Sequence, residues 1–301
     1  MKRKDLLGLL ELSAEEILSV VDAGAVIKAR LKAGDKQSDL LRGMSAVTLF
    51  YENSTRTRCS FDLAAKNLGA NVINLDVAGS SVQKGETLLD TGKTLDMQQN
   101  DFIVIRHPAS GAPKLLAKNV KAHVINAGDG MNEHPTQALL DLLTMKETFG
   151  KIEGLRVAVL GDILHSRVAK SNLFALTKLG AEVRMFGPRT LMPAGLERLG
   201  AKVCSFREEA IEGVDVVMGL RIQRERQKEG NFPSLGEYSK YYGVDEEILT
   251  LAAPHAIVMH PAPVNRGVEL TSAVVDGSKS RIEEQVFSGL AIRMAVFEAL
   301  I

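Results

Sequence analysis

Short apolar runs alternate along the chain with longer stretches in which apolar residues recur every three or four positions. The short runs are rich in valine, isoleucine and leucine and predict buried β-strands, whereas the wider spacing predicts amphipathic helices. Strands are expected at residues 46–51, 72–75, 101–105, 124–126, 156–160, 182–186, 201–205, 214–218 and 256–260. Helices are expected at residues 12–31, 61–68, from Pro135 onwards, 168–179 and 282–301.

This alternation predicts an α/β protein in which parallel sheets are flanked by helices. The pattern begins again near Phe149, and 301 residues are enough for two domains of ordinary size. We therefore expect two domains, each with its own parallel sheet. The first would comprise residues 1–147 and the second residues 148–284, with a C-terminal helix at 285–301 that packs back on the first.

Composition and charge narrow the classes of partner. Lysine plus arginine equals aspartate plus glutamate at 37 each, so no global field favours nucleic acid or a membrane surface. No apolar run reaches the roughly 20 residues of a membrane helix, and the N-terminal apolar run is too short for a signal peptide. Cys59 and Cys204 are too few for a disulfide framework and lack metal-ligand spacing, which suits a reducing cytoplasm. Both are expected to be buried.

The segment Ser54-Thr55-Arg56-Thr57-Arg58 lies between a predicted strand and a predicted helix, and therefore at a helix N-terminus. Unpaired backbone N–H groups and the helix dipole favour an anion there, and the segment adds three hydroxyls and two guanidinium groups. The alternative is that Ser54 and Thr55 cap the helix while both arginines face solvent. Because two arginines in a first turn oppose the dipole unless an anion offsets them, the segment predicts a phosphate site.

Further polar residues follow the ends of predicted strands, where open parallel sheets bind ligands. Arg106 follows the strand at 101–105, and Arg221 and Gln223 follow the strand at 214–218. His134 precedes Pro135 at another predicted helix N-terminus. The dipole there favours a neutral imidazole that can donate to a carbonyl, although a histidine that only caps the helix fits this segment equally well.

In a fold of this kind, a dinucleotide site would lie at the turn after the strand at 156–160. It lacks the second and third glycines of that fingerprint, which argues against NAD, and it carries His165, Ser166 and Arg167 instead.

Three segments predict irregular structure. Residues 78–87 read as an exposed loop that contains Ser80 and Lys84, although Lys84 alone fits an ordinary solvated lysine equally well. Residues 224–243 are dense in charge and glycine and predict a long flexible lid, with a solvated surface loop as the alternative. Residues 260–267 are too rich in proline to continue the preceding strand, which frees their carbonyl groups to line a ligand.

Together these motifs resemble those of the carbamoyltransferase family, over essentially the whole chain. Ser-Thr-Arg-Thr-Arg at 54–58 and His-Pro-Thr-Gln at 134–137 are similar to motifs of the whole superfamily. Ser-Val-Gln-Lys-Gly-Glu at 81–86 and His-Pro-Ala-Pro-Val-Asn-Arg-Gly at 260–267 are similar to motifs of its aspartate branch. The Ser-Met-Gly and His-Cys-Leu-Pro elements of the ornithine branch are absent from the sequence.

The resemblance implies the aspartate/ornithine carbamoyltransferase fold and transfer of a carbamoyl group from carbamoyl phosphate to L-aspartate, an early step of pyrimidine biosynthesis. It also implies roles at matching positions. The residues that would bind phosphate are Ser54, Thr55, Arg56, Thr57 and Arg106. The groups that would polarise the carbonyl oxygen are Thr57, Arg106 and His134. The carbamoyl amide would contact Gln137 and the backbone of Ala262 and Pro263. The aspartate carboxylates would be bound by Arg167, Arg221 and Gln223, together with Lys84. Ser80 and Lys84 would come from the neighbouring subunit of a homotrimer.

The chemistry of the two substrates agrees with these implied roles. Both are dianions, and five cationic side chains would face them: Arg56, Lys84, Arg106, Arg167 and Arg221. No metal, redox cofactor or covalent intermediate is expected, because carbamoyl phosphate is already activated. Two alternatives stay open, namely a carbamoyltransferase for another amino acid such as ornithine and a non-catalytic anion-binding scaffold. A regulatory chain or a dihydroorotase is a further candidate partner, for which the sequence carries no readable motif.

Overall fold

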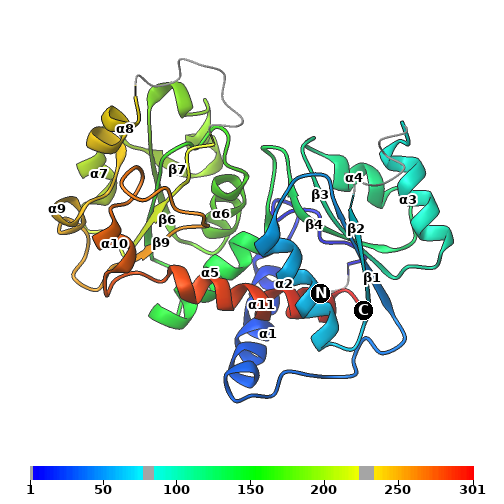
Figure 1. The fold of residues 1–301 in the computed structure, drawn as a ribbon. Helices are drawn as coiled ribbons and strands as arrows, with labels where there is room; N and C mark the ends of the chain where they lie inside the picture. The colour runs from blue at the N-terminus through cyan, green and yellow to red at the C-terminus, as the bar shows by residue number, and fades with distance from the viewer. Residues whose placement is uncertain (1–2, 77–84, 224–233) are drawn as a thin grey trace. The chain divides into compact units, whose positions relative to one another are not determined.

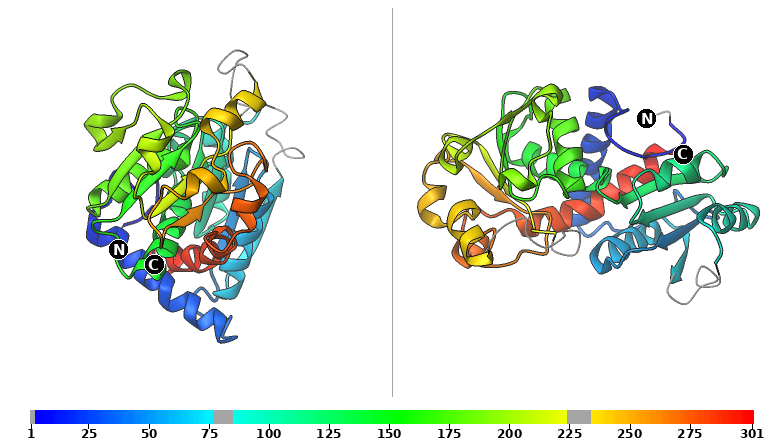
Figure 2. Two further views of the ribbon diagram at one scale, coloured as in Figure 1. Left: turned by 90° about the vertical axis from the view of Figure 1, so that its left-hand side faces the viewer. Right: turned by 90° about the horizontal axis from the view of Figure 1, so that it is seen from above.

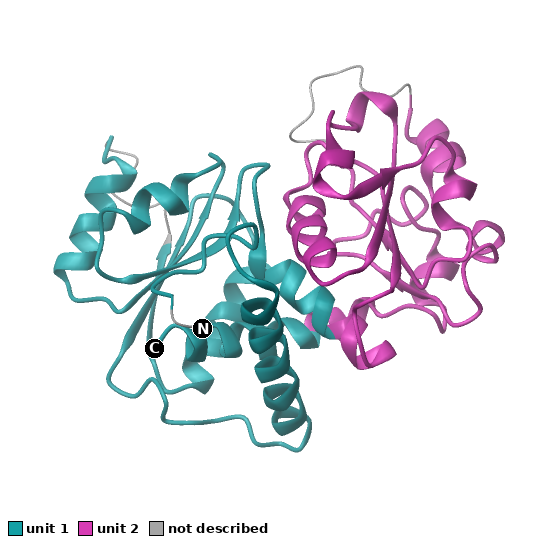
Figure 3. Cartoon of the chain, turned by 180° about the vertical axis from the view of Figure 1, so that it is seen from behind, with its two compact units in different colours: residues 1–143, 287–301 teal, residues 144–286 magenta. Residues whose placement is uncertain are grey.

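The structure is a computed structural model of the chain, and it describes residues 3–76, 85–223 and 234–301. Strands and helices alternate along it (Figure 1). The chain divides into two compact units (Figure 3). Unit 1 comprises Met1–Leu143 and Phe287–Ile301, and unit 2 comprises Thr144–Val286. The chain passes from one unit to the other inside two helices, α5 (Pro135–Phe149) and α11 (Ile282–Ala299).

Unit 1 is built on a four-stranded parallel sheet in the order β2-β1-β3-β4. Its strands are β1 (Ser45–Phe50), β2 (Asn71–Asp76), β3 (Phe102–His107) and β4 (His123–Asp129). The chain leaves β1 towards β2 on one side and returns to β3 on the other. The carboxyl ends of β1 and β3 therefore flank a topological switch point, where open parallel sheets bind their ligands.

Helices cover both faces of this sheet. On one face, α3 (Leu88–Met97) and α4 (Ala112–Ala117) place Leu95 and Leu116 against Val47 and Ile103. On the other face, the Phe297 ring of α11 packs edge-on against Phe61 and Phe102, with ring centroids 6.1 and 5.0 Å apart.

Two further helices belong to unit 1. Phe61 belongs to α2 (Thr55–Asn67). Helix α1 (Ala14–Lys32) begins at a capping box between Ser13 and Glu16.

Unit 2 is built on a five-stranded parallel sheet in the order β7-β6-β5-β8-β9. Its strands are β5 (Arg156–Leu160), β6 (Glu182–Phe186), β7 (Ala201–Val203), β8 (Val216–Gly219) and β9 (Ile257–Met259). The connections diverge between β5 and β8, so this sheet also has a switch point at its carboxyl edge.

The helices of unit 2 lie on both sides of its sheet (Figures 1 and 2). One side is packed by α7 (Arg207–Ile211), α9 (Glu246–Leu249) and α10 (Ser272–Asp276), whose buried residues form one apolar cluster with the strands. Helix α6 (Arg167–Lys178) covers the other side. Helix α8 (Leu235–Tyr242) buries Tyr238, and short 3-10 turns occur at Arg189–Leu191 and Leu196–Leu199.

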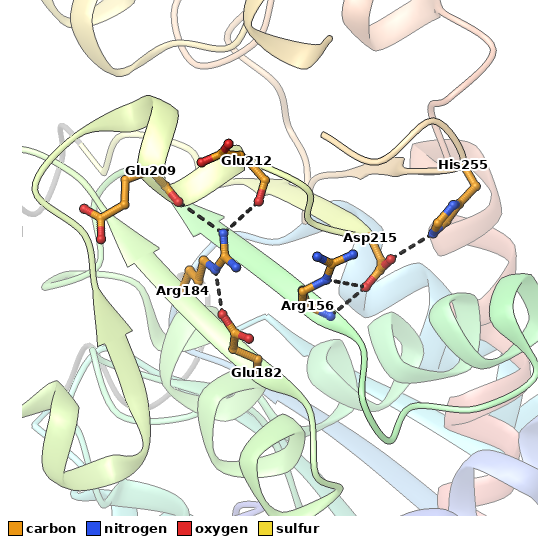
Figure 4. Close-up of polar contacts among 7 residues, drawn as sticks. All are labelled: Arg156, Glu182, Arg184, Glu209, Glu212, Asp215 and His255. Atoms are coloured by element: carbon orange, nitrogen blue, oxygen red, sulfur yellow. Dashed lines mark hydrogen bonds and ion pairs between the residues drawn. The ribbon is translucent and has the colours of Figure 1, made fainter. Parts of the chain in front are cut away.

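The amino edge of this second sheet is fixed by polar contacts (Figure 4). Asp215 accepts a hydrogen bond of 2.8 Å from the backbone N–H of Arg156 and lies 2.8 Å from Nε2 of His255. On the next strand, Arg184 pairs with Glu182 and donates to the carbonyl oxygens of Glu209 and Glu212. These contacts join strands and loops at the edge opposite the switch point, so their role is structural.

Most predicted elements are present, two expectations need correction, and several helices were not predicted. Within the expected lid, residues 235–242 form helix α8, capped by Ser234, because the side chain of Tyr238 finds a buried site. Residues 224–233 lie outside the described part of the chain. Cys204 is buried as expected, but Cys59 is exposed because it lies on the outward side of α2. The pattern also did not predict several helices, among them α3 and α4.

In the described residues, no helix is long and apolar enough to cross a membrane. The described chain also contains no group of three or more His, Cys, Asp or Glu residues placed to hold a metal ion.

Candidate active site

The first part of the site is the N-terminus of α2, at the carboxyl end of β1. Ser54 is the N-cap residue, but its side chain makes no capping hydrogen bond, and the first turn contains no acidic residue. This contradicts the part of the alternative interpretation in which Ser54 caps the helix, whereas the exposure of Arg56 agrees with its other part. Arg56 is exposed and Thr57 is buried. This turn combines N–H groups that a helix cannot satisfy internally with a guanidinium group, the combination that binds phosphate.

Arg106 lies beside this turn, because β3 pairs with β1 in a register that sets Arg106 opposite Phe50. The carbonyl oxygen of Arg106 accepts a hydrogen bond of 2.8 Å from the N–H of Tyr51. Its Nε lies 3.2 Å from Oε2 of Glu52, and both side chains are largely buried, with 15% and 21% exposed. Glu52 therefore holds the guanidinium at the strand end, and it was not predicted from the sequence.

The neighbouring residue, His107, adds no cation here. Burial lowers the pKa of its imidazole, and its Nδ1 accepts a hydrogen bond of 2.9 Å from the N–H of Ala109. Lowering the pKa of a histidine favours its neutral form at pH 7.

His134 and Gln137 lie at the start of α5, just beyond the end of β4. Both are buried, and the carbonyl oxygen of His134 accepts the N–H groups of Gln137 and Ala138 at 3.0 and 3.3 Å. The Gln137 side chain donates from Nε2 to Oδ1 of Asp141 over 2.9 Å, one turn further along the helix. This bond fixes the orientation of the amide, so that Oε1 is the atom of Gln137 left to accept from a ligand.

In unit 2, one buried carboxylate organises the ends of β5 and β8. The Asp162 side chain is fully buried and lies 2.9 Å from Nδ1 of His165. It also accepts the backbone N–H groups of His165 and Gln223, at 3.2 and 3.4 Å. Gly161 is required beside it, since its φ is +128° and a Cβ there would lie 3.0 Å from both the Leu220 carbonyl oxygen and the Tyr238 hydroxyl.

The three candidate aspartate ligands, Arg167, Arg221 and Gln223, lie on the segments that come after β5 and β8. Arg167 is the first residue of α6, which Ser166 caps by accepting the Ala169 N–H at 3.1 Å. Arg221 and Gln223 follow β8, and their side chains are joined by a hydrogen bond of 3.2 Å. Two arginines and a glutamine therefore follow the strands that flank the switch point of the second sheet.

The last segment follows β9. His260 is fully buried, and Ala262 has a φ of +50°, which is uncommon for a residue other than glycine. The Ala262-Pro263 peptide bond is cis.

The structure thus places the described candidates at two strand edges, each within its own unit. In unit 1 these are Ser54, Thr55, Arg56, Thr57, Arg106, His134 and Gln137. In unit 2 they are Arg167, Arg221, Gln223, Ala262 and Pro263. The predicted site residues Ser80 and Lys84 lie outside the described residues.

Comparisons with known proteins agree with this architecture. The model of the aspartate/ornithine carbamoyltransferase carbamoyl-P binding domain matches residues 4–147, and that of the Asp/Orn binding domain of the same family matches residues 153–300. The chain therefore belongs to the aspartate/ornithine carbamoyltransferase family.

Within that family, two relatives at high identity carry the same name. The chain is 58% identical to the aspartate carbamoyltransferase catalytic subunit of Ruminiclostridium cellulolyticum, covering 100% of this chain and 96% of that protein. It is 59% identical to the subunit of the same name from Acetivibrio thermocellus, with the same coverage.

Solved structures extend the likeness to the fold. Aspartate transcarbamoylase from Trypanosoma cruzi, in complex with carbamoyl phosphate and aspartate, matches with a TM-score of 0.90 and 32% identity, over 100% of this chain and 97% of that one. Ornithine carbamoyltransferase from Thermus thermophilus matches with a TM-score of 0.88 and 29% identity, over 100% and 99%. Since both branches share the fold, the choice of acceptor depends on the site residues.

Proposed function

We propose that this chain transfers the carbamoyl group of carbamoyl phosphate to L-aspartate, giving N-carbamoyl-L-aspartate and phosphate. The observation that carries the proposal is the pair of arginines with a glutamine at the ends of β5 and β8, Arg167, Arg221 and Gln223. Guanidinium groups bind carboxylates through paired hydrogen bonds, and the same groups would repel the side-chain ammonium of ornithine. The 58% and 59% identity to aspartate carbamoyltransferase catalytic subunits supports the same acceptor.

Carbamoyl phosphate would bind through the first turn of α2. Ser54, Thr55, Arg56 and Thr57 would take the phosphate together with Arg106, which would exchange its contact with Glu52 for the ligand. Thr57, Arg106 and His134 would polarise the carbonyl oxygen. Gln137 would accept from the carbamoyl amide through Oε1, which its bond to Asp141 leaves available, and the backbone of Ala262 and Pro263 would accept from the same amide.

Catalysis would need no added group. The α-amine of aspartate attacks the carbamoyl carbon, the bond from that carbon to the phosphate oxygen breaks, and the phosphate leaves with the electron pair and takes up the amine proton. Holding two reactants in line is worth about 7 to 11 kcal/mol in favourable cases, and one well-placed oxyanion donor about 2.7 to 4 kcal/mol. Arg56, Thr57, Arg106 and His134 are the proposed catalytic residues, with Lys84 from a neighbouring chain.

The assembly and setting are part of the same proposal. Ser80 and Lys84 would enter the site from the neighbouring subunit of a homotrimer, and Lys84 would also contact aspartate. The enzyme would act in the cytoplasm in pyrimidine biosynthesis, with a regulatory chain or a dihydroorotase as a candidate partner. Residues 1–147 with the C-terminal helix 285–301 would form the carbamoyl-phosphate domain, and residues 148–284 the aspartate domain.

The test is phosphate release from carbamoyl phosphate by the purified protein, with L-aspartate and L-ornithine compared as acceptors. Turnover with aspartate alone is expected. Turnover with ornithine would show that Arg167 and Arg221 do not select the acceptor. Silence with both acceptors would favour a non-catalytic anion-binding scaffold.

A further inference from the structure

The backbone after β9 has an unusual balance of hydrogen-bonding groups. Pro261 and Pro263 have no N–H, so Ala262 provides the only backbone donor of the segment 261–263. That donor is already used, because the Ala262 N–H donates to Nδ1 of His260 over 2.9 Å. Among the residues that the structure describes, none donates a hydrogen bond to the carbonyl oxygens of Pro261, Ala262 or Pro263. The segment therefore presents acceptors and no donor.

The buried carboxylate of Glu269 lies beside the His260 side chain, which accepts the Ala262 N–H. His260 and Glu269 have side-chain exposures of 0% and 2%, and Nε2 of His260 lies 3.3 Å from Oε1 of Glu269. Because Nδ1 accepts from Ala262, the proton of a neutral imidazole must be on Nε2, facing Glu269. The same carboxylate oxygen accepts the N–H of Asn265 over 2.7 Å, which ties the far end of the loop to the same point.

The backbone conformation needs this support. Ala262 has a φ of +50°, in the left-handed region that residues with a Cβ rarely adopt, and such residues persist when their surroundings hold them there. His260 is itself held through its N–H, which donates to Oε1 of Gln285 over 2.9 Å. The His260 imidazole therefore connects the end of β9 to Ala262 and helps to hold Ala262 in its left-handed conformation.

We propose that His260 is a positioning residue that makes the site selective for a carbamoyl group. By taking up the Ala262 N–H, it leaves the 261–263 backbone able to bind only a group with hydrogen-bond donors, as the carbamoyl amide has, and Glu269 maintains the tautomer that this requires. The inference rests on the proposed function, in which this backbone meets the carbamoyl amide. A methyl group in place of the amide would leave the carbonyl oxygens without their partner and bind less well.

The matched variants are His260→Asn and His260→Gln. The shorter asparagine amide places an acceptor near the position of Nδ1, so His260→Asn can still accept from Ala262. The longer glutamine amide reaches towards Glu269 and loses the contact with Ala262. The quantity to measure is the inhibition constant of acetyl phosphate, the methyl counterpart of the substrate, divided by the KM for carbamoyl phosphate. Inorganic phosphate serves as the control ligand because it lacks both groups.

We expect His260→Gln to reduce this ratio by about 3- to 10-fold, the value of one or two weakened hydrogen bonds, and His260→Asn to keep it within about twofold. Inhibition by inorganic phosphate should change in neither. Glu269→Gln, which keeps the side-chain volume and an acceptor for Asn265, should reduce the ratio by about threefold, and it serves as the second test if His260→Gln fails to fold.

An unchanged ratio in a folded His260→Gln or Glu269→Gln protein would overturn the inference, as would equal losses in His260→Asn and His260→Gln. Either result would leave aspartate-dependent turnover by the wild-type protein untouched. Absence of that turnover would instead overturn the proposed function.

Discussion

At the scale of single residues, the candidate substrate contacts are oriented by buried acidic side chains that would not touch a substrate. Asp141 orients the Gln137 amide, and Glu52 holds the Arg106 guanidinium. Asp162 binds both the turn before Arg167 and the segment that contains Gln223. A buried carboxylate that accepts several hydrogen bonds limits the orientations open to its donors, which is how a site is fixed before its ligand arrives.

The first prediction concerns Asp141. In Asp141→Asn the new amide can either accept from Gln137 Nε2 or donate to Gln137 Oε1, so the Gln137 amide loses its single orientation. Half of the orientations would then present donors to the carbamoyl amide, which also consists of donors. We expect the KM for carbamoyl phosphate to rise by about 3- to 10-fold, with a smaller change in kcat.

Steady-state kinetics with saturating aspartate measure this change, and the inhibition constant of inorganic phosphate is the internal control because phosphate does not need Gln137. A rise in both constants by the same factor would show a general distortion of the site and contradict the orienting role of Asp141.

The sequence predicts the contacts that lie within one motif and misses those that cross the fold. Ser54 to Arg58 could be recognised because a strand, a turn and a helix follow one another in a single short stretch. Glu52 and Arg106 are 54 positions apart, and Asp162 and Gln223 are 61 apart, so only the pairing of strands brings them together. Asp141 is near Gln137 in sequence, but an acidic residue in an otherwise apolar stretch gives no sign of its partner.

At the scale of elements, both sheets carry the candidate ligand groups at their carboxyl edge, and the second sheet has structural polar contacts at its amino edge. The second sheet shows this with two buried carboxylates, Asp162 at the carboxyl edge and Asp215 at the amino edge. Hydrogen bonds from Arg156 and His255 hold the pKa of Asp215 below its usual value, although burial alone would raise it.

The second prediction compares substitutions of Asp215, at the amino edge, and Asp162, at the carboxyl edge. Asp215→Asn should lower the free energy of unfolding of the protein by about 2 kcal/mol at pH 7, because hydrogen bonds to a charged acceptor are lost, and should leave the KM values unchanged. Asp162→Asn should instead raise the KM for aspartate by about tenfold or more, because the segments that carry Arg167 and Gln223 lose their shared anchor.

The effect of Asp215 on stability should depend on pH in one direction. Its pKa is lower in the folded than in the unfolded chain, whose reference value is 3.8, so the folded protein gains stability from it above that value. The gain is lost as pH falls through the folded pKa. Thermal or urea unfolding of wild type and Asp215→Asn should differ at pH 7 and converge as the pH falls below the folded pKa of Asp215. A difference that persists at low pH would mean that side-chain packing, and not the charge, is responsible.

Elements with strong periodicity are predicted well, and elements stabilised mainly by tertiary contacts are not. Strands β5 and β6 occupy the predicted residues. Helix α3 was missed because Thr91, Gly92 and Thr94 have low helix propensity. Its stability comes from packing, since Gly92 lets α3 approach the Leu116 side chain of α4 closely. Helix α8 was missed for a similar reason. Its segment is rich in charged residues and glycine, and its one buried residue, Tyr238, does not produce a recognisable apolar pattern.

At the scale of the whole molecule, the proposed homotrimer gives the third prediction. If Arg56 and Lys84 of different chains complete one site, then inactive Arg56→Ala and Lys84→Ala proteins should regain activity when they are dissociated and reassociated together. Random mixing would create an intact site at about one position in four, so about a quarter of the wild-type activity is expected.

Each variant taken alone through the same dissociation and reassociation provides the control and should stay inactive. Mixed trimers that re-form correctly and still show no turnover would mean that each site is built within one chain. The predicted domain limits at residues 147 and 284 stay a prediction. The mixing experiment does not test them, because the recovery of activity does not depend on where one domain ends and the next begins.

The route of the chain through α5 and α11 has a consequence for protein synthesis. Unit 2 is one continuous segment, Thr144–Val286, whereas unit 1 needs Phe287–Ile301 from the end of the chain. Phe297, which packs between Phe61 and Phe102 in the core of unit 1, is translated after all of unit 2. A ribosome that adds about 5 to 20 residues per second therefore synthesises all of unit 2 before it adds this side chain. The unit whose synthesis begins first is the one whose core is completed last.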